Sequence, residues 1–388
     1  MLITVEFISI RDGSEVNIDP DLMAQTLQYG PSTGFPPLVR VLTEFQSKMH
    51  GNSTNILSQE GQWGVLPVSG SMDGISKSFE LFLNEGDTYL LEVPTYSGIL
   101  AALGPHSATA ICCEVDSAGL NPSLVREKLE ETQRKGLPKP KFLYSCPTGT
   151  NPTGVSTTPD RRKEIYALAC EFDFFIIEDD PYYFLHFGDQ QLPSYLSFDT
   201  EGRVLRMDSF SKLLSAGIRL GFVTASTPLI QRLILHMQAT QMHPCNISQA
   251  LVAQLFHQWG HEKFMEHTKT VVNFYRKQQE AMVKAADTHL KDIVEFTTPN
   301  GGMFLWMKVP GIPDTKQLIM QRAIEKKVMF VPGNVFFPDA EWSDLEAKSD
   351  FKQYIRASYS FASADEMNEG FKRLREAIEE EMSAIHKN

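Results

Sequence analysis

A lysine preceded by hydroxyl side chains and followed by an arginine is the first feature of the sequence that could carry chemistry. The segment Ser209-Phe210-Ser211-Lys212 stands seven positions before Arg219, which has Gly217 and Gly221 close by. Serine hydroxyls and a guanidinium suit a phosphate group, because both donate hydrogen bonds to anionic oxygens. Most loop lysines are solvated, but these neighbours favour an amine held beside a phosphate site. That is the requirement of pyridoxal phosphate (PLP) bound as a Schiff base.

Four more polar residues follow predicted strands or turns, namely Ser71, Tyr96, Asn151 and Asp179. Ligands of parallel sheets bind beyond the carboxyl ends of the strands, so these side chains are expected near Lys212. Each signal is weak alone. Without its companions, Asn151-Pro152-Thr153-Gly154 would indicate only a turn. The acids before Pro181 would indicate a capped loop or metal ligands, and a lone tyrosine is usually a packing residue.

Short apolar runs alternate with helical patterns through most of the chain. Strands are predicted at 65–69, 88–93, 141–144, 174–178, 204–207 and 220–224. A helix is predicted from Ser71, with Ile75, Phe79 and Phe82 on one face, and another at 159–172. This alternation predicts an α/β fold with a mostly parallel sheet and helices on both faces.

The pattern changes after about residue 290. Strands are predicted at 303–309, 328–331 and 354–359, before a last helix that opens with the capping box Ser363 and Glu366. The apolar stripe of this helix is Met367, Phe371, Leu374 and Ile378. We therefore predict an N-terminal segment (1–30), a large domain (31–290) and a small C-terminal α+β domain (291–388).

Bulk composition excludes several classes of protein. The 388 residues carry a formal net charge of -12, which argues against nucleic-acid binding. The five cysteines show neither zinc-site nor disulfide spacing, so we expect reduced thiols and no metal. The sequence contains no run of 18 apolar residues, so no membrane span is predicted. Residues 1–10 are apolar but lack a basic leader and a cleavage site, so a strand is expected there rather than a signal peptide.

The run SFSKLLSAGIRLGF, residues 209–222, resembles the cofactor-lysine segment of fold-type-I PLP aminotransferases. The resemblance covers the chain from about residue 20 and implies a seven-stranded type of sheet. It also implies that Lys212 holds PLP and is the catalytic residue, and that Arg219 binds the phosphate. The other implied cofactor contacts are Asp179 at the ring nitrogen, Asn151 and Tyr182 at the phenolic oxygen, Tyr96 on the ring face, and Ser71 and Ser209 at the phosphate.

Two further residues enter through the same resemblance. Arg356, in Tyr354-Ile355-Arg356-Ala357-Ser358, matches the arginine that binds the substrate α-carboxylate, with Asn151 beside it. A guanidinium suits that role because it binds a carboxylate with two parallel hydrogen bonds. Tyr29 matches a tyrosine that reaches the PLP phosphate of the neighbouring subunit, which implies a homodimer with shared sites. Met72 stands where related enzymes often carry a polar residue, so one phosphate contact is expected to be absent.

The resemblance is closest to the 2-aminoadipate/kynurenine aminotransferase group, through runs such as KFLYSCPTGTNPTG and IIEDDPYYF. Members of that group have a longer N-terminal arm that lines the substrate pocket. Only 28 residues precede Tyr29 here. We therefore expect a differently closed pocket or an incomplete N-terminus, and a location in the cytoplasm or in mitochondria.

These observations predict a PLP-dependent aminotransferase. It is expected to move the amino group of 2-aminoadipate, kynurenine or another aromatic or long-chain amino acid to 2-oxoglutarate by a ping-pong mechanism. Phe304, Tyr96 and Met242 are candidate side-chain contacts for the donor. The alternatives are another PLP reaction, such as that of a lyase, and a PLP-binding protein with impaired catalysis. A dinucleotide-binding enzyme is the least supported alternative, since no GxGxxG motif follows a predicted strand.

Overall fold

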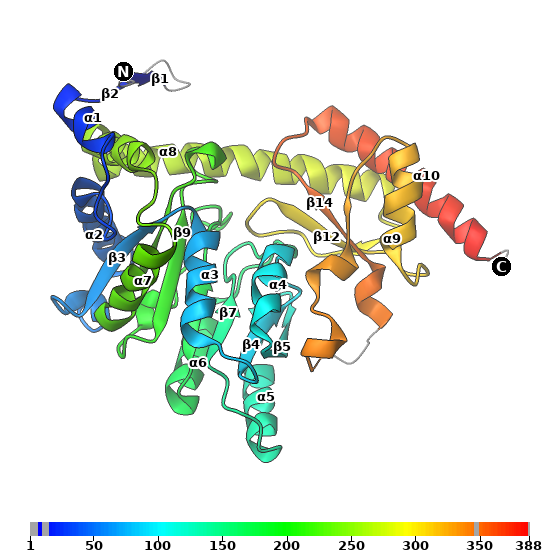
Figure 1. Ribbon diagram of the computed structural model, residues 1–388. Helices are drawn as coiled ribbons and strands as arrows, with labels where there is room; N and C mark the ends of the chain where they lie inside the picture. Colours follow the sequence, from blue (N-terminus) through cyan, green and yellow to red (C-terminus); the bar gives the residue numbers. More distant parts are fainter. Residues whose placement is uncertain (1–6, 10–14, 345–348, 387–388) are drawn as a thin grey trace.

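The computed structural model describes residues 7–9, 15–344 and 349–386 (Figure 1). Its main sheet has the strand order β3-β10-β9-β8-β7-β4-β5-β6. Neighbouring strands from β9 to β5 run parallel, whereas β10 is antiparallel to both β3 and β9, and β6 is antiparallel to β5. The strands are β3 (Trp63–Val68), β4 (Thr88–Val93), β5 (Thr109–Asp116), β6 (Gly119–Leu120), β7 (Phe142–Ser145), β8 (Phe175–Asp179), β9 (Val204–Ser209) and β10 (Gly221–Ser226).

Helices cover both faces of this sheet, because alternate strand residues are apolar on opposite sides. Leu91, Ile177 and Leu205 pack with α3 (Ser71–Phe82), α4 (Ser97–Leu103) and α7 (Thr227–Thr240). Their strand neighbours Leu90 and Ile176 pack with α5 (Pro122–Arg134) and α6 (Pro159–Phe172) on the other side. A three-layer α/β architecture follows, as the sequence predicts.

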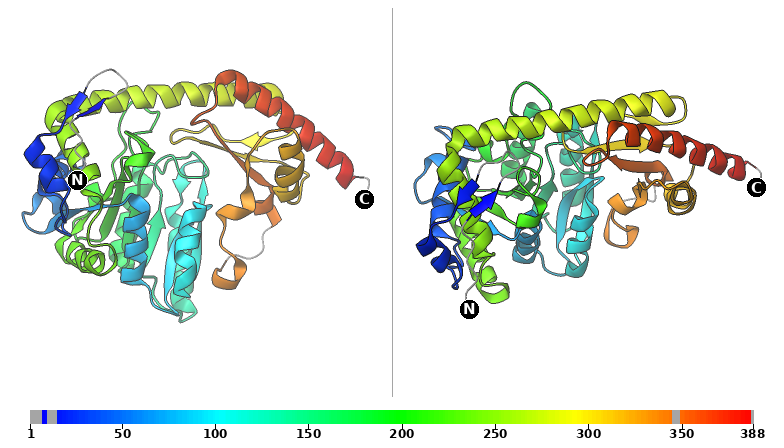
Figure 2. Two further views of the ribbon diagram at one scale, coloured as in Figure 1. Left: turned by 45° about the horizontal axis from the view of Figure 1, so that its top comes forward. Right: turned by 90° about the horizontal axis from the view of Figure 1, so that it is seen from above.

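A long helix connects the main sheet to the C-terminal part of the chain. Helix α8 (Asn246–His289) contains a kink at Gly260, whose φ and ψ are 63° and -178°. Figures 1 and 2 show α8 running from the helices near the N-terminus to α10 (Ala364–Ile385), which lies beside it. Helices α1 (Pro20–Thr26) and α2 (Pro36–His50) pack against the first part of α8.

The C-terminal part contains a second sheet with the order β11-β12-β14-β13. All of its strand pairs are antiparallel. Its elements are β11 (Glu295–Phe296), β12 (Phe304–Lys308), α9 (Thr315–Gln317) continued by a π-helical stretch (Leu318–Ala323), β13 (Val331–Pro332) and β14 (Tyr354–Ser358). The predicted capping box between Ser363 and Glu366 is present at the start of α10. The predicted stripe on α10 is buried in one core with the second sheet.

Three details differ from the sequence-based predictions. The main sheet has eight strands rather than seven, because the two-residue β6 extends it. Strand β5 was not predicted. The strand predicted at 328–331 is wrong for most of its length. The amide of Val328 donates to the carbonyl of Ala323 in a turn where Lys327 has a φ of 59°, and β13 begins only at Val331.

The strand predicted at 1–10 coincides in part with β1 (Phe7–Ser9), which pairs with β2 (Glu15–Asn17). Residues 1–6 and 10 lie outside the described residues. The bounds of the three predicted domains remain predictions.

Candidate active site

A cavity of about 330 Å³ lies beyond the carboxyl ends of the parallel strands and reaches the second sheet. Ten residues were assigned from the resemblance to the cofactor or to the substrate carboxylate, and nine of them line the cavity. They are Ser71, Tyr96, Asn151, Asp179, Tyr182, Ser209, Lys212, Arg219 and Arg356. Residues from several separate strand ends and helix starts therefore meet in one place, as expected for an open parallel sheet.

Lys212 lies in a tight turn after β9. The amide of Leu214 donates to the carbonyl of Phe210 at 2.9 Å, and the amide of Phe210 donates to the carbonyl of Leu220 at 3.2 Å. Phe210 and Leu213 are buried in the core, which fixes the turn on both sides of the lysine. Burial, followed by the positive charge of Arg219, lowers the pKa of the Lys212 amine. A lowered pKa favours the neutral amine, the form that attacks a carbonyl carbon.

Asp179 is the last residue of β8, and its carboxyl group is buried at the floor of the cavity. The Tyr144 hydroxyl donates to Asp179 Oδ2 at 2.7 Å, whereas Asp179 Oδ1 has no hydrogen-bond partner. Burial raises the pKa of Asp179 to about 7, against the opposing hydrogen bond from Tyr144. An unpaired buried carboxylate oxygen needs a donor, so this atom calls for a ligand N–H or O–H group.

The first turn of α3 and the turn after β9 form one end of the cavity. Gly70 is the N-cap of α3 and offers no side chain to the helix amides, so the first turn of α3, which begins at Ser71, has no side-chain cap. Arg219 Nη2 donates to the carbonyl of Ser69 at 3.4 Å, and Nη1 to that of Ala216 at 3.3 Å. A helix N-terminus beside a guanidinium binds phosphate well, because both present positive charge and N–H donors.

Gly70 leaves space for the Arg219 side chain. Its φ is 89°, and a Cβ atom at this position would lie 2.7 Å from Arg219 Nη2. Arg219 itself has a φ of 49°, which is uncommon for a residue other than glycine. Such backbone conformations persist where the surrounding structure requires them, and here they direct the guanidinium toward the start of α3.

The opposite end of the cavity is built around Arg356 on β14. Its guanidinium carbon lies 4.2 Å from the ring centre of Phe304 and 4.9 Å from that of Phe336. Nη1 donates to Asn151 Oδ1 at 2.7 Å, whereas the buried Nε has no partner. Burial lowers the pKa of Arg356, but guanidinium groups remain charged in proteins. An anion with two oxygens, such as a carboxylate, matches this arginine.

Two tyrosines complete the wall of the cavity. Tyr182 is buried, and burial raises the pKa of its phenol well above the usual range, so the phenol is neutral and its hydroxyl can donate a hydrogen bond. Tyr96 precedes α4 and is partly exposed. Met72 also lines the cavity, so an apolar side chain stands at the position where related enzymes often carry a polar one.

Tyr29 and Met242 do not line the cavity. Tyr29 is 83% exposed, and its ring packs edge-on against His243 at a centroid distance of 6.3 Å. Met242 is half-exposed and has a φ of 69°. The prediction of Met242 as a donor contact is therefore wrong for the pocket of a single chain, whereas Phe304 and Tyr96 lie in its wall.

Sequence reasoning missed other residues of the site. Tyr144 and Phe336 were not singled out, because a tyrosine or phenylalanine in an apolar segment carries no sign of a polar partner. Buried Arg206, on β9 and three residues before the strand's end, was also missed. Its only signal is a charged residue in the middle of the apolar run 204–207, which β-strand packing would bury.

The donors and acceptors of the cavity fit PLP. The lysine amine matches its aldehyde, the start of α3 with Ser209 and Arg219 matches its phosphate, and the unpaired Asp179 Oδ1 matches a protonated ring nitrogen. In the described part of the chain, no group of three or more His, Cys, Asp or Glu side chains is arranged to hold a metal ion. Within the same residues, no helix is both long and apolar enough to cross a membrane.

Comparisons with known proteins agree with this geometry. Residues 15–374 match the family model of class I and II aminotransferases. The mitochondrial kynurenine/alpha-aminoadipate aminotransferase of Mus musculus is 43% identical over 380 residues, which are 96% of this chain and 88% of the relative. The corresponding protein of Bos taurus is 42% identical over 381 residues, 97% of this chain and 88% of the relative.

Solved structures show the same fold. The kynurenine aminotransferase of Pyrococcus horikoshii, solved with PMP, superposes with a TM-score of 0.83 at 32% identity, covering 93% of this chain and 86% of that one. The alpha-aminoadipate aminotransferase of Thermus thermophilus superposes with a TM-score of 0.79 at 30% identity, covering 92% and 85%. The chain belongs to the class I and II aminotransferases, enzymes that transfer amino groups with pyridoxal phosphate as cofactor.

Proposed function

We propose that this enzyme transfers the amino group of kynurenine, 2-aminoadipate or another aromatic or long-chain L-amino acid to 2-oxoglutarate. The names of its mouse and bovine relatives, which cover nearly the whole chain, support this group of donors. The aromatic rings of Tyr96 and Phe304 in the cavity wall suit a ring or a methylene chain. A single site that serves donor and acceptor in turn gives ping-pong kinetics.

In this proposal each group of residues in the cavity binds one part of the cofactor or of the substrate. Lys212 holds the aldehyde carbon covalently, while Ser71, Ser209 and Arg219 bind the phosphate. Asp179 accepts a hydrogen bond from the ring nitrogen, Asn151 and Tyr182 bond the phenolic oxygen, and Tyr96 lies on the ring face. Arg356 binds the α-carboxylate of the substrate. Its present bond to Asn151 at 2.7 Å supports this arrangement, because it places the carboxylate end next to the phenolic-oxygen end.

The chemistry of the protein side is proton transfer. The bound cofactor withdraws electrons from the substrate α-carbon and thereby makes its proton acidic. Once the donor amine has taken its place, Lys212 Nζ would accept that proton as a general base and, as a general acid, donate it to the carbon that had been the aldehyde carbon of the cofactor. The buried surroundings of Lys212 lower the pKa of its amine and so increase the fraction able to act as a base. Arg356 fixes the α-carbon within reach by binding the carboxylate.

We further propose a homodimer in which Tyr29 contacts the phosphate site of the partner subunit. Its large exposed fraction and its position outside the cavity of its own chain support a role between subunits. For location we propose the cytoplasm or mitochondria, and the mitochondrial relatives support the latter.

The meeting of Lys212, Asp179, Arg219 and Arg356 in one cavity carries the proposal. We would record the absorbance of the PLP-loaded enzyme before and after adding kynurenine, 2-aminoadipate or phenylalanine without an acceptor. The proposal predicts conversion to the pyridoxamine form with at least one of these donors, and reversal with 2-oxoglutarate. A Lys212→Ala variant is the control and should not convert.

Other outcomes identify the alternatives. Conversion without reversal by 2-oxoglutarate but with reversal by another 2-oxo acid would correct the acceptor alone. Release of a non-amine product with the cofactor spectrum unchanged at the end would indicate a lyase. A Lys212-dependent spectrum that no donor alters would indicate a PLP-binding protein with impaired catalysis, and would contradict the proposed donors.

A further inference from the structure

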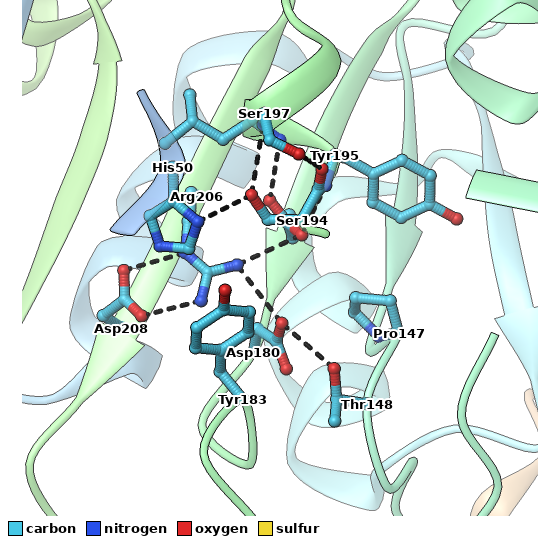
Figure 3. Close-up of polar contacts among 12 residues, drawn as sticks. His50, Pro147, Thr148, Asp180, Tyr183, Ser194, Tyr195, Ser197, Arg206 and Asp208 are labelled. Carbon is cyan, nitrogen blue, oxygen red and sulfur yellow. Dashed lines mark hydrogen bonds and ion pairs between the residues drawn. The ribbon is translucent and has the colours of Figure 1, made fainter. Parts of the chain in front are cut away.

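A fully buried arginine lies directly behind the cavity floor. Arg206 Nη1 lies 3.1 Å from Glu178 Oε1 and 3.2 Å from Asp180 Oδ2, and Nη2 lies 2.9 Å from Asp208 Oδ1. Figure 3 shows the guanidinium between Asp180 and Asp208 with the Tyr183 ring beside it, 4.5 Å from ring centre to guanidinium carbon. One buried cation thus binds three acids, an arrangement that is expensive to desolvate and needs an explanation.

The strand register places this cluster next to Asp179. Glu178 and Asp179 of β8 pair with Arg206 and Met207 of β9. Because side chains alternate along a strand, Glu178 and Asp180 point to Arg206 while Asp179 points into the cavity. Arg206 therefore connects the strand that carries Asp179 with the strand that leads into Lys212.

The charges around Asp179 depend on this arginine. Behind the larger effect of burial, Asp180 and Asp208 raise the pKa of Asp179, and Arg206 lowers it. The other groups facing Asp179 are neutral or farther along the cavity: burial raises the pKa values of Tyr144, Cys146 and Tyr182, and burial lowers that of Lys212.

The groups packed on the far side of the cluster add little positive charge. Burial, followed by the charge of Arg206, lowers the pKa of His50, whose imidazole is therefore neutral. A second buried arginine, Arg162, reaches Asp180 only through Thr148, with bonds of 3.1 Å and 3.2 Å. Without Arg206, the acids on both sides of Asp179 would have no direct cationic partner among the described residues.

We propose that Arg206 is a positioning residue that binds Glu178, Asp180 and Asp208 and thereby keeps Asp179 anionic and directed at the ring nitrogen of the cofactor. This inference rests on the proposed role of Asp179. Negative charge beside Asp179 would increase the affinity of its carboxylate for the proton that it shares with the ring nitrogen, and Arg206 opposes this effect. The proton then stays on the ring nitrogen, where it makes the ring a strong electron acceptor.

The test is the position of that proton. We would bind pyridoxamine phosphate labelled with ¹⁵N in the ring and measure the ¹⁵N chemical shift, which differs widely between a neutral and a protonated ring. The wild-type enzyme should give a protonated ring. Arg206→Gln, which keeps hydrogen-bond donors but loses the charge, should shift the resonance toward the neutral ring. Arg206→Lys is the matched control with the charge retained and should resemble the wild type.

A rescue separates charge balance from structural support. Adding Asp180→Asn to Arg206→Gln removes one negative charge and should return the resonance toward the protonated ring. If the cluster only held the strands together, the double variant would be as poor as the single variant or worse, and the proposal would be overturned. A resonance unchanged by Arg206→Gln would overturn it as well. A change of one pKa unit in the carboxyl corresponds to about a tenfold change in its ratio of ionised to neutral forms.

Buried ion pairs are sensitive to loss of one partner, so Arg206→Gln requires a second measurement if it does not fold. In the wild-type background, Asp180→Asn and Asp208→Asn should each raise the pH above which the ¹⁵N resonance changes to that of the neutral ring. An unchanged or lower pH for this transition would contradict the proposal. Failure of the wild-type enzyme to bind pyridoxamine phosphate would instead count against the proposed function, so the two failures are distinguishable.

Discussion

Asp179 shows at the scale of one residue how the site is prepared for its ligand. Its carboxyl group is buried, accepts one bond from Tyr144 and leaves Oδ1 unpaired. A buried acid without a full set of donors is unfavourable in the cofactor-free protein. The ligand supplies the missing donor, so the energy lost on folding is recovered when the cofactor binds.

This residue predicts a pH dependence of stability. The pKa of Asp179 is raised from 3.8 to about 7, so the folded chain holds a proton that the unfolded chain releases above 3.8. The free energy of unfolding of the cofactor-free protein should therefore fall as the pH rises from about 4 to about 7. Asp179→Asn should remove part of this fall, by a few kcal/mol at most, in urea unfolding measured across that range.

Asp173→Asn is the matched control with the opposite sign. Bonds from Lys139 and Arg203 lower the pKa of exposed Asp173 to about 2. The stabilisation that these bonds give is fully present above the pKa that Asp173 has in the unfolded chain, and it is lost as the pH falls toward 2. Asp173→Asn should therefore change the slope of stability against pH only below about pH 4, and it should leave the slope between pH 4 and 7 unchanged. An unchanged slope between pH 4 and 7 in Asp179→Asn would contradict the burial argument.

At the scale of elements, the start of α3 and the turn after β9 must fit together closely. A Cβ at Gly70 would meet the end of the Arg219 side chain, which can move, rather than backbone atoms. Gly70→Ala should therefore displace the guanidinium. We expect PLP affinity to fall roughly 10- to 100-fold, the range of one lost hydrogen bond to a charged group, in a fluorescence titration.

Gly86→Ala provides the control for this prediction. Gly86 has a φ of 81°, close to the 89° of Gly70, but a Cβ there would have no neighbour within 4 Å. Both variants should lose roughly 1–3 kcal/mol of folding stability, because a positive φ is unfavourable for a residue that carries a Cβ atom. Only Gly70→Ala should lose cofactor affinity. An equal loss of affinity in both would show that backbone strain, and not displacement of Arg219, is responsible.

The helices and strands could largely be predicted from the sequence, whereas contacts between distant residues could not. Helix α10 and six of the main-sheet strands, β3, β4 and β7 to β10, could be predicted because their apolar residues recur at the periods of helix and strand. The Ser363 and Glu366 cap has a local signature as well. Tyr144 and Arg206 were missed because their roles depend on partners far away in the sequence, Asp179 and the acids of β8. Local patterns do not contain such contacts. The site residues that were found came mainly from family resemblance.

At the scale of the whole molecule, the cavity of one chain lacks Tyr29, which lies exposed near His243. If Tyr29 serves the partner subunit, an inactive and a weakened variant should complement each other. Lys212→Ala mixed with Tyr29→Ala forms hybrid dimers that have one site with Lys212 in one chain and Tyr29 in the other. With random pairing of equal amounts, about a quarter of all sites should be intact.

Activity after unfolding and refolding the two variants together measures this complementation. The same variants refolded separately and then mixed are the control. If Tyr29 acts only within its own chain, or if the chain is a monomer, joint refolding should give no gain over that control. Sedimentation of the wild-type enzyme should show a dimer.

The lysine to which the cofactor is attached can be identified chemically. We would reduce the PLP-loaded enzyme with borohydride, digest it and identify the phosphopyridoxyl-modified peptide by mass spectrometry. We expect modification of Lys212, and we expect this modification to be lost when a donor amino acid is added before reduction, because the donor amine displaces the lysine. Modification of a different lysine, or no modification, would contradict the assignment of this cavity as the active site.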